Sequence, residues 1–122
     1  MANATALIPF SASTQGQGVK VAATSTAGTL IHTTGTSATI VDRLSIWAYN
    51  AHSADVELTI EFGGATAPDQ NIVQTITADT GLTLVVDGLI LLGNGSAALT
   101  VKAFAGTTNV IVLNGYVMRV TP

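Results

Sequence analysis

Short β-rich runs separated by turn-forming residues are the feature that most restricts how this chain can fold. From Val19 onward, runs of Val, Ile, Leu and Thr alternate with clusters of Gly, Asn, Ser and Asp, which leaves no room for helices. This pattern is typical of an all-β sandwich or barrel. Eight strands are predicted, near residues 18–24, 29–34, 38–51, 55–63, 71–77, 82–92, 97–104 and 109–120. Eight runs suit two packed four-stranded sheets, so we expect a single-domain, jelly-roll-like β-sandwich.

The clearest strand pattern lies in residues 55–63, where apolar and polar side chains alternate. Successive side chains of a strand point to opposite faces, so each set occupies one face of the sheet. The apolar set is Val56, Leu58, Ile60 and Phe62, and the polar set is Glu57, Thr59 and Glu61. We expect both carboxylates to face solvent, and we expect most other acidic residues to lie in loops or on solvent faces: Asp42, Asp55, Asp69, Asp79 and Asp87.

The pair Asn114-Gly115 divides the last apolar run and allows two interpretations. A type I′ hairpin turn favours Asn-Gly, because both central residues need a positive φ angle. Alternatively, the pair marks a bulge within one long strand. The flanking runs are apolar on both faces, which favours the bulge and suits a strand covered on both sides. The sandwich core can cover one face, and a neighbouring protomer can cover the other.

Residues 1–17 differ in composition, and we interpret them as an N-terminal arm ahead of a β-sandwich domain, residues 18–122. The arm consists of Ala, Thr, Ser, Gln and Gly around one short apolar group. One interpretation of this segment is a frayed terminus. The other is an arm that becomes ordered by docking Leu7, Ile8 and Phe10 on a neighbouring protein.

The composition argues for a protein that packs against other proteins. Hydrophobic residues make up 48% of the chain and charged residues 9%, against about 25% charged in a typical soluble domain. We therefore expect some apolar surface to meet another subunit. The net charge of −3 and the scattered positions of the four Lys and Arg residues argue against nucleic acid as a partner. No apolar run is long enough to span a membrane, and the first residues do not resemble a signal peptide.

The residue types provide little for catalysis or for binding a metal ion. A nucleophilic triad needs a histidine beside a carboxylate and a hydroxyl, and the two histidines are His32 and His52. His32 lies in a predicted strand, where hydrogen bonding to neighbouring residues is the usual role. The histidines and acidic residues do not have the spacing of metal ligands. We therefore predict no enzymatic activity, no catalytic residues, no cofactor and no metal site.

Trp47 and Tyr49 are the best candidates for a recognition surface, because they share one face of the strand predicted over residues 38–51. An exposed aromatic pair can stack on a sugar ring or anchor a protein partner. The alternative for this pair is packing within the core or between the sheets. The full set of candidate interface residues is Leu7, Ile8, Phe10, Trp47, Tyr49 and Tyr116.

Several short motifs resemble small β-rich proteins from the virion-structure modules of tailed bacteriophages. They are Leu7-Ile8-Pro9-Phe10-Ser11, Gly16-Gln17-Gly18-Val19-Lys20-Val21-Ala22-Ala23, Thr59-Ile60-Glu61-Phe62-Gly63-Gly64 with Ala67-Pro68-Asp69, and the closing Asn114-Gly115-Tyr116-Val117. The resemblance spans nearly the whole chain. It implies a virion component that decorates or cements the capsid exterior, or that serves as the base of a head fibre. It also implies a symmetric trimer with a sandwich or jelly-roll body, and it transfers no catalytic residue.

The resemblance also implies partners and a location. The expected partners are further copies of the chain, as a homotrimer, and the major capsid protein or another virion protein; nucleic acid and membranes are not expected. The expected location is the virion, after synthesis in the bacterial cytoplasm, which agrees with the lack of cysteine. A neck, tail or head-fibre component is an alternative within this group. A carbohydrate-binding module that stacks sugars on Trp47 and Tyr49 is an alternative outside it, and a metal-dependent jelly-roll enzyme would need ligands that the sequence lacks.

Overall fold

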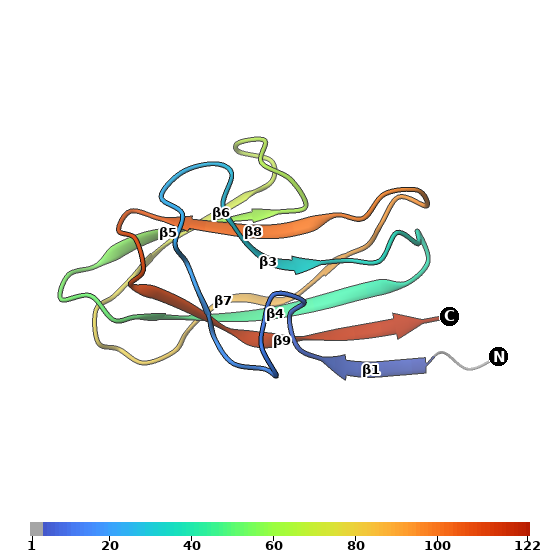
Figure 1. Cartoon of the computed structure of the whole chain (residues 1–122), viewed down its shortest axis with the longest axis horizontal. Coiled ribbons are helices and arrows are strands. Elements are labelled where there is room, and N and C mark those ends of the chain that lie inside the picture. Colours follow the sequence, from blue (N-terminus) through green and yellow to red (C-terminus); the bar gives the residue numbers. More distant parts are fainter. Residues whose placement is uncertain (1–3) are drawn as a thin grey trace.

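Two antiparallel β-sheets pack face to face in the computed structural model, which describes residues 4–122 (Figure 1). Within these residues there are nine strands and no helix. The five-stranded sheet contains β1 (Ala4–Ile8), β2 (Val19–Lys20), β4 (Val41–Asn50), β7 (Thr83–Leu91) and β9 (Ile111–Thr121). The four-stranded sheet contains β3 (Thr29–Thr33), β5 (Val56–Phe62), β6 (Asn71–Ile76) and β8 (Thr100–Ala105). The predicted all-β sandwich is confirmed, and each of the eight predicted runs contains a strand.

The order of the strands is that of a jelly roll. One sheet has the order β1-β9-β4-β7, with β2 also paired to β9, and the other sheet has the order β3-β8-β5-β6. From β2 onward, every connection between consecutive strands crosses to the opposite sheet, except the one between β5 and β6, which pair within one sheet. These crossings bring together strands that are far apart in sequence. They place β4 and β9 at the centre of the five-stranded sheet.

The N-terminal segment is built into the sandwich of its own chain. β1 pairs antiparallel with the C-terminal half of β9, and Figure 1 shows the two strands side by side. Phe10 follows β1, is only 2% exposed and belongs to the core. The amide of Ala12 then donates to the carbonyl oxygen of Ile31 on β3 at 3.1 Å, so the segment contacts both sheets. Phe10 therefore occupies the interior of its own chain, whereas we expected it on an interface.

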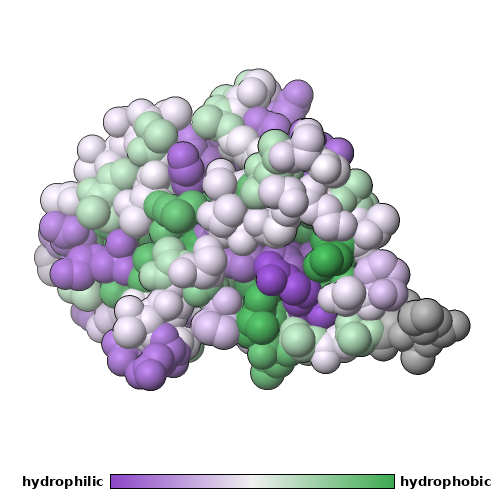
Figure 2. All heavy atoms as spheres, turned by 45° about the vertical axis from the view of Figure 1, so that its right-hand side comes forward, coloured by the Kyte–Doolittle hydropathy of each residue, from purple (hydrophilic) through white to green (hydrophobic). Residues whose placement is uncertain are grey.

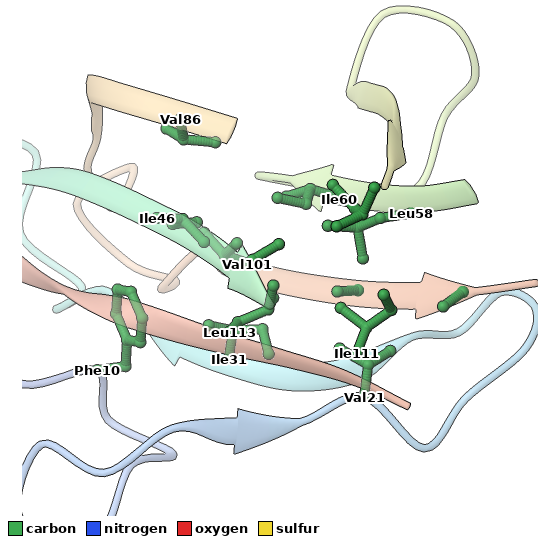
Figure 3. Packing of buried hydrophobic residues seen from close by; sticks show 14 of the residues in the cluster. Phe10, Val21, Ile31, Ile46, Leu58, Ile60, Val86, Val101, Ile111 and Leu113 are labelled. Atoms are coloured by element: carbon green, nitrogen blue, oxygen red, sulfur yellow. The ribbon is translucent and has the colours of Figure 1, made fainter. Parts of the chain in front are cut away.

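Apolar side chains from both sheets fill the space between them (Figure 3). Ile46 of β4 and Leu113 of β9 come from one sheet, and Leu58 and Ile60 of β5 come from the other. All four side chains are fully buried. Protein interiors are close-packed, so truncation of such a side chain to Ala costs about 2–5 kcal/mol. Both sheets therefore depend on the same core.

Glu61 does not face solvent, and our prediction for this carboxylate was wrong. The side chain points to the outer side of the four-stranded sheet, but it is only 2% exposed because residues 26–28 cover it. Glu61 Oε2 accepts a hydrogen bond from the hydroxyl of Thr26 at 2.9 Å, and Oε1 accepts one from the amide of Gly28 at 2.7 Å. Glu57, on the same face, is exposed as predicted. The position of a distant loop thus decides the burial of a residue that the alternation assigns to the solvent side.

β9 continues through the Asn-Gly pair at residues 114–115, so the pair forms neither a hairpin nor a bulge against β4. The register between β9 and β4 is unbroken along this stretch. Gly115 has a φ angle of 152°, and a Cβ at this position would collide with the carbonyl oxygen of Ser45 and with the ring of Phe10. The glycine is therefore not part of a turn. It allows the backbone of β4 and the ring of Phe10 to lie close to β9. The bulges of this sheet lie in β7, whose register against β4 shifts twice.

Candidate interaction surface

The outer face of the five-stranded sheet carries a group of aromatic and aliphatic side chains that no other part of the described chain covers. Antiparallel pairing places directly opposed residues on the same face, so the register identifies the members of this group. We call the following set the outer face: Thr5 and Leu7 of β1; Lys20 of β2; Val41, Arg43, Ser45, Trp47 and Tyr49 of β4; Leu84, Asp87 and Ile90 of β7; Val112, Asn114, Tyr116, Met118 and Val120 of β9.

The outer face is organised in rows that cross the strands. One row runs through Leu7, Met118, Arg43 and Ile90; the next runs through Tyr116, Ser45 and Asp87; a third runs through Asn114, Trp47 and Leu84; and a fourth runs through Lys20, Val112 and Tyr49. Residues in such rows contact each other directly across the sheet. The apolar side chains therefore spread over four strands, with the charged residues Arg43, Asp87 and Lys20 and the polar Asn114 among them.

Trp47 and Tyr116 form the aromatic centre of the outer face. Their ring centroids lie 6.0 Å apart with the ring planes tilted by 36°. Pairs of this geometry contribute about 0.5–1.5 kcal/mol beyond the burial of their area. Trp47 is half-buried and Tyr116 is 40% exposed, so the pair packs on the surface of the sheet and not within the core.

The structure brings together four of the six candidate interface residues, namely Leu7, Trp47, Tyr49 and Tyr116. Ile8 is adjacent to Leu7 in β1, but it packs against the core, and Phe10 lies within the core. Leu84, Ile90 and Met118 complete the apolar area, although the sequence did not single them out. Met118 follows the alternation of β9, whereas the bulges of β7 break the alternation between Leu84 and Ile90, so the pairing of the strands was needed to place these residues beside Trp47 and Tyr116.

Tyr116 lines two hollows of the surface. The larger has a volume of about 430 Å³ and is lined by Leu7, Ile8, Pro9, Gln15, Gly16, Gly115 and Tyr116. It lies along the edge of β9 where β1 has ended and β2 has not yet begun. The smaller has a volume of about 110 Å³ and is lined by Arg43, Ser45, Asp87, Tyr116 and Met118. Hydrophobic side chains reach the protein surface in several patches, one of them at the lower edge in Figure 2. Hollows beside exposed aromatic rings are suited to receive side chains of a partner.

Arg43 and Asp87 are the charged residues beside Tyr116 on the outer face, and both side chains are exposed. Lys20 of β2 lies further along the face, opposite Val112. Arg43 Nε donates to the carbonyl oxygen of Gly88 at 3.2 Å, which holds the guanidinium group over β7. Both residues line the smaller hollow. Among residues 4–122 the ion pairs involve Asp42, so Arg43 and Asp87 do not form one with each other. Each charge is therefore free to pair with a group from outside the chain.

A buried polar cluster lies between the sheets, away from the outer face. His32 of β3 and Asp42 of β4 are each 1% exposed, and their Nε2 and Oδ2 atoms lie 2.7 Å apart. Arg119 of β9 donates to both oxygens of Asp42, with Nε at 2.7 Å from Oδ1 and Nη2 at 2.9 Å from Oδ2. Burial raises the pKa of Asp42, but the hydrogen bonds from Arg119 and His32 outweigh it and hold the pKa below its ordinary value of 3.8. We expected Asp42 in a loop or on a solvent face, and this prediction was wrong. Its carboxylate is buried and pairs with Arg119 and His32.

The hydrogen bonds of His32 assign this cluster a structural role. The amide of Ser11 donates to His32 Nδ1 at 3.0 Å, so this nitrogen carries the lone pair and Nε2 carries the proton that it donates to Asp42. Both ring nitrogens are therefore occupied, and no lone pair is left to take a proton from a substrate. The hydroxyl of Ser11 also accepts from the amide of Thr33 at 2.8 Å. The cluster consequently fastens the N-terminal segment and the two sheets to one another.

No group of three or more His, Cys, Asp or Glu residues within residues 4–122 is arranged to hold a metal ion. In the same residues there is no helix with the length and apolar character needed to cross a bilayer. The chain matches no protein-family model and no curated protein. The outer face, with its aromatic pair, is therefore the feature from which a function is argued.

Proposed function

We propose that this protein is a structural component of a tailed-bacteriophage virion that decorates or cements the capsid exterior as a homo-oligomer. Its partners in this role are further copies of the chain, as a homotrimer, and the major capsid protein or another virion protein. It would be made in the host cytoplasm and located on the virion. The observation that carries the proposal is the outer face, an apolar sheet surface with an aromatic centre that its own chain leaves uncovered.

The composition of the outer face supports a protein contact. Trp and Tyr are the residues most enriched among those that dominate protein interfaces, and Lys and Glu are depleted there. Trp47, Tyr49 and Tyr116 lie on the outer face, and the strands of this sheet contain no Glu. Lys20 of β2 lies at the end of the face, opposite Val112. The side chains stand on paired strands of a sandwich, so little conformational freedom is lost when a partner docks. A rigid apolar face of this kind suits a protein that reinforces contacts in a lattice.

The repeated arrangement of subunits on a capsid favours an oligomeric partner. On a capsid, several copies of an oligomer contact several capsid subunits at the same time, and weak single contacts then combine through their effective concentration. A protein with this role needs contact surfaces and no reactive groups. The jelly-roll sandwich of this chain provides such surfaces on both sides of one core.

Binding to empty capsids tests the proposal. Purified protein is mixed with empty capsids of a tailed bacteriophage that lack their exterior decoration, and bound protein is measured by co-sedimentation and imaged by electron microscopy. We expect saturable binding at symmetry-related sites on the capsid. Binding to isolated necks or tails instead would favour the alternative virion positions, and no binding to any virion part would contradict the proposal.

A carbohydrate-binding module is the second candidate, because the Trp47–Tyr116 pair lies beside a hollow that a sugar ring could enter. Aromatic rings stack on the apolar faces of sugars. In that case the fluorescence of Trp47, the single tryptophan of the chain, should change when glycans are added. Capsid binding with no fluorescence response to a panel of glycans would exclude this candidate.

A further inference from the structure

We propose that the outer face packs against the outer face of a second copy of this chain, with Arg43 of one copy beside Asp87 of the other. The inference deepens the proposed function, on whose self-association it rests, by naming one contact surface and its occupant. It is carried by the arrangement of these two charges around one hollow beside the aromatic centre of the outer face.

The two charges are close in the sheet but do not neutralise each other. Arg43 lies opposite Ile90, and Asp87 lies opposite Ser45, two positions further along β4. Both side chains are exposed and line the same hollow, yet they do not form an ion pair within the described residues. The hollow beside Tyr116 therefore offers one unpaired positive charge and one unpaired negative charge.

The unpaired charges restrict which partner can cover this face. A purely apolar partner would bury Arg43 and Asp87 without counter-charges, which is costly. A suitable partner must supply one anion and one cation at the same spacing on an apolar surface. A second copy of the outer face does so, because in a symmetric contact residue i meets residue j and residue j meets residue i.

The geometry of the sheet is compatible with this contact. Sheets pack face to face through side chains that interdigitate, with their strands nearly aligned. The hollow between Arg43, Asp87 and Tyr116 can receive a side chain from the facing copy. Such a contact uses the same surface on both copies, so it closes a pair about a two-fold axis. It is therefore separate from the contacts that join the copies of a homotrimer, which use two different surfaces of each copy.

Charge-reversal variants test whether Arg43 and Asp87 meet between two copies of the chain. Arg43→Asp makes residues 43 and 87 both negative, and Asp87→Arg makes both positive. Each variant alone should self-associate at least about tenfold more weakly than the wild type, because like charges then face each other. When the two variants are mixed, opposite charges meet again, and heteromers should form. The masses are measured by light scattering after size-exclusion chromatography, and heteromers by capture of the untagged variant on the tagged one.

Glu57→Arg is the matched control, because it reverses an exposed charge on the opposite sheet and should leave self-association unchanged. Circular dichroism verifies that each variant retains its β-fold. A monomeric wild type, charge variants with the wild-type mass, or mixed variants that form no heteromer would each overturn the inference. Capsid binding by a monomeric wild type would overturn the self-contact and leave the virion role standing. A protein that self-associates through the outer face but binds no virion part would support the self-contact and contradict the virion role.

Discussion

Gly115 shows how one residue limits what the central strand can tolerate. A Cβ at this position would collide with the carbonyl oxygen of Ser45 and with the ring of Phe10, and the φ angle of 152° is rare for other residues. We expect Gly115→Val to lower the free energy of unfolding by about 3 kcal/mol, measured by urea denaturation. Gly35→Ala is the control, because a Cβ there meets nothing within 4 Å. Equal losses in both variants would show that the close approach at Gly115 is not important.

Asp42 gives the fold a predictable dependence on pH. The hydrogen bonds from Arg119 and His32 hold its pKa in the folded state below the ordinary value of 3.8, which is the value expected in the unfolded chain. The stabilisation from this group is therefore fully present above pH 3.8 and is lost as the pH falls through the folded-state pKa. We expect the free energy of unfolding to decrease as the pH is lowered from about 5 to about 2.

Asp42→Asn tests whether this carboxylate causes the decrease. The variant removes the carboxylate that pairs with the partly exposed Arg119 and should lose about 1–3 kcal/mol at neutral pH. Its free energy of unfolding should then depend less on pH in the acid range, as followed by urea denaturation at several pH values. Glu57→Gln removes an exposed carboxylate and should retain the wild-type slope. A slope that is the same in Asp42→Asn and the wild type would argue against Asp42 as the titrating group.

At the scale of elements, β1 and the residues after it connect the two sheets. β1 extends the five-stranded sheet, and the amide of Ser11 donates to His32 on the four-stranded sheet at 3.0 Å. Phe10, between them, is 2% exposed, whereas Leu7 is 66% exposed. We expect Phe10→Ala to cost about 3–5 kcal/mol in urea denaturation and Leu7→Ala to cost little. A frayed arm would predict almost no loss from either substitution.

At the scale of the whole molecule, contact between outer faces links stability to protein concentration. Only the folded chain presents this surface, so self-association stabilises the folded state by mass action. We expect the Tm to rise as the concentration of the wild-type protein is raised. Trp47→Ser removes the aromatic centre of the surface and should abolish most of this rise, as measured by differential scanning calorimetry. A wild-type Tm that is independent of concentration would argue against the association.

Local pattern was enough to predict the sandwich and most of its strands. The alternation in residues 56–62 predicts β5, and each of the eight runs proposed from such patterns contains a strand. The same alternation places Trp47 and Tyr49 on one face of β4, where the structure has them. These predictions succeed because the side-chain period of a strand is a property of the chain itself and needs no knowledge of its neighbours.

Pairing between distant parts of the chain decided the remaining features. Asp42 and Arg119 are 77 residues apart, and only the adjacency of β4 and β9 makes them an ion pair. The burial of Glu61 depends on a loop 33 to 35 residues away, and the strand conformation of Ala4–Ile8 depends on β9. Likewise, Leu7 and Tyr116 meet on one surface because the register of β1 and β9 aligns them. Such contacts depend on which strands become neighbours, which is a property of the assembled sandwich and leaves no periodic signal in the chain.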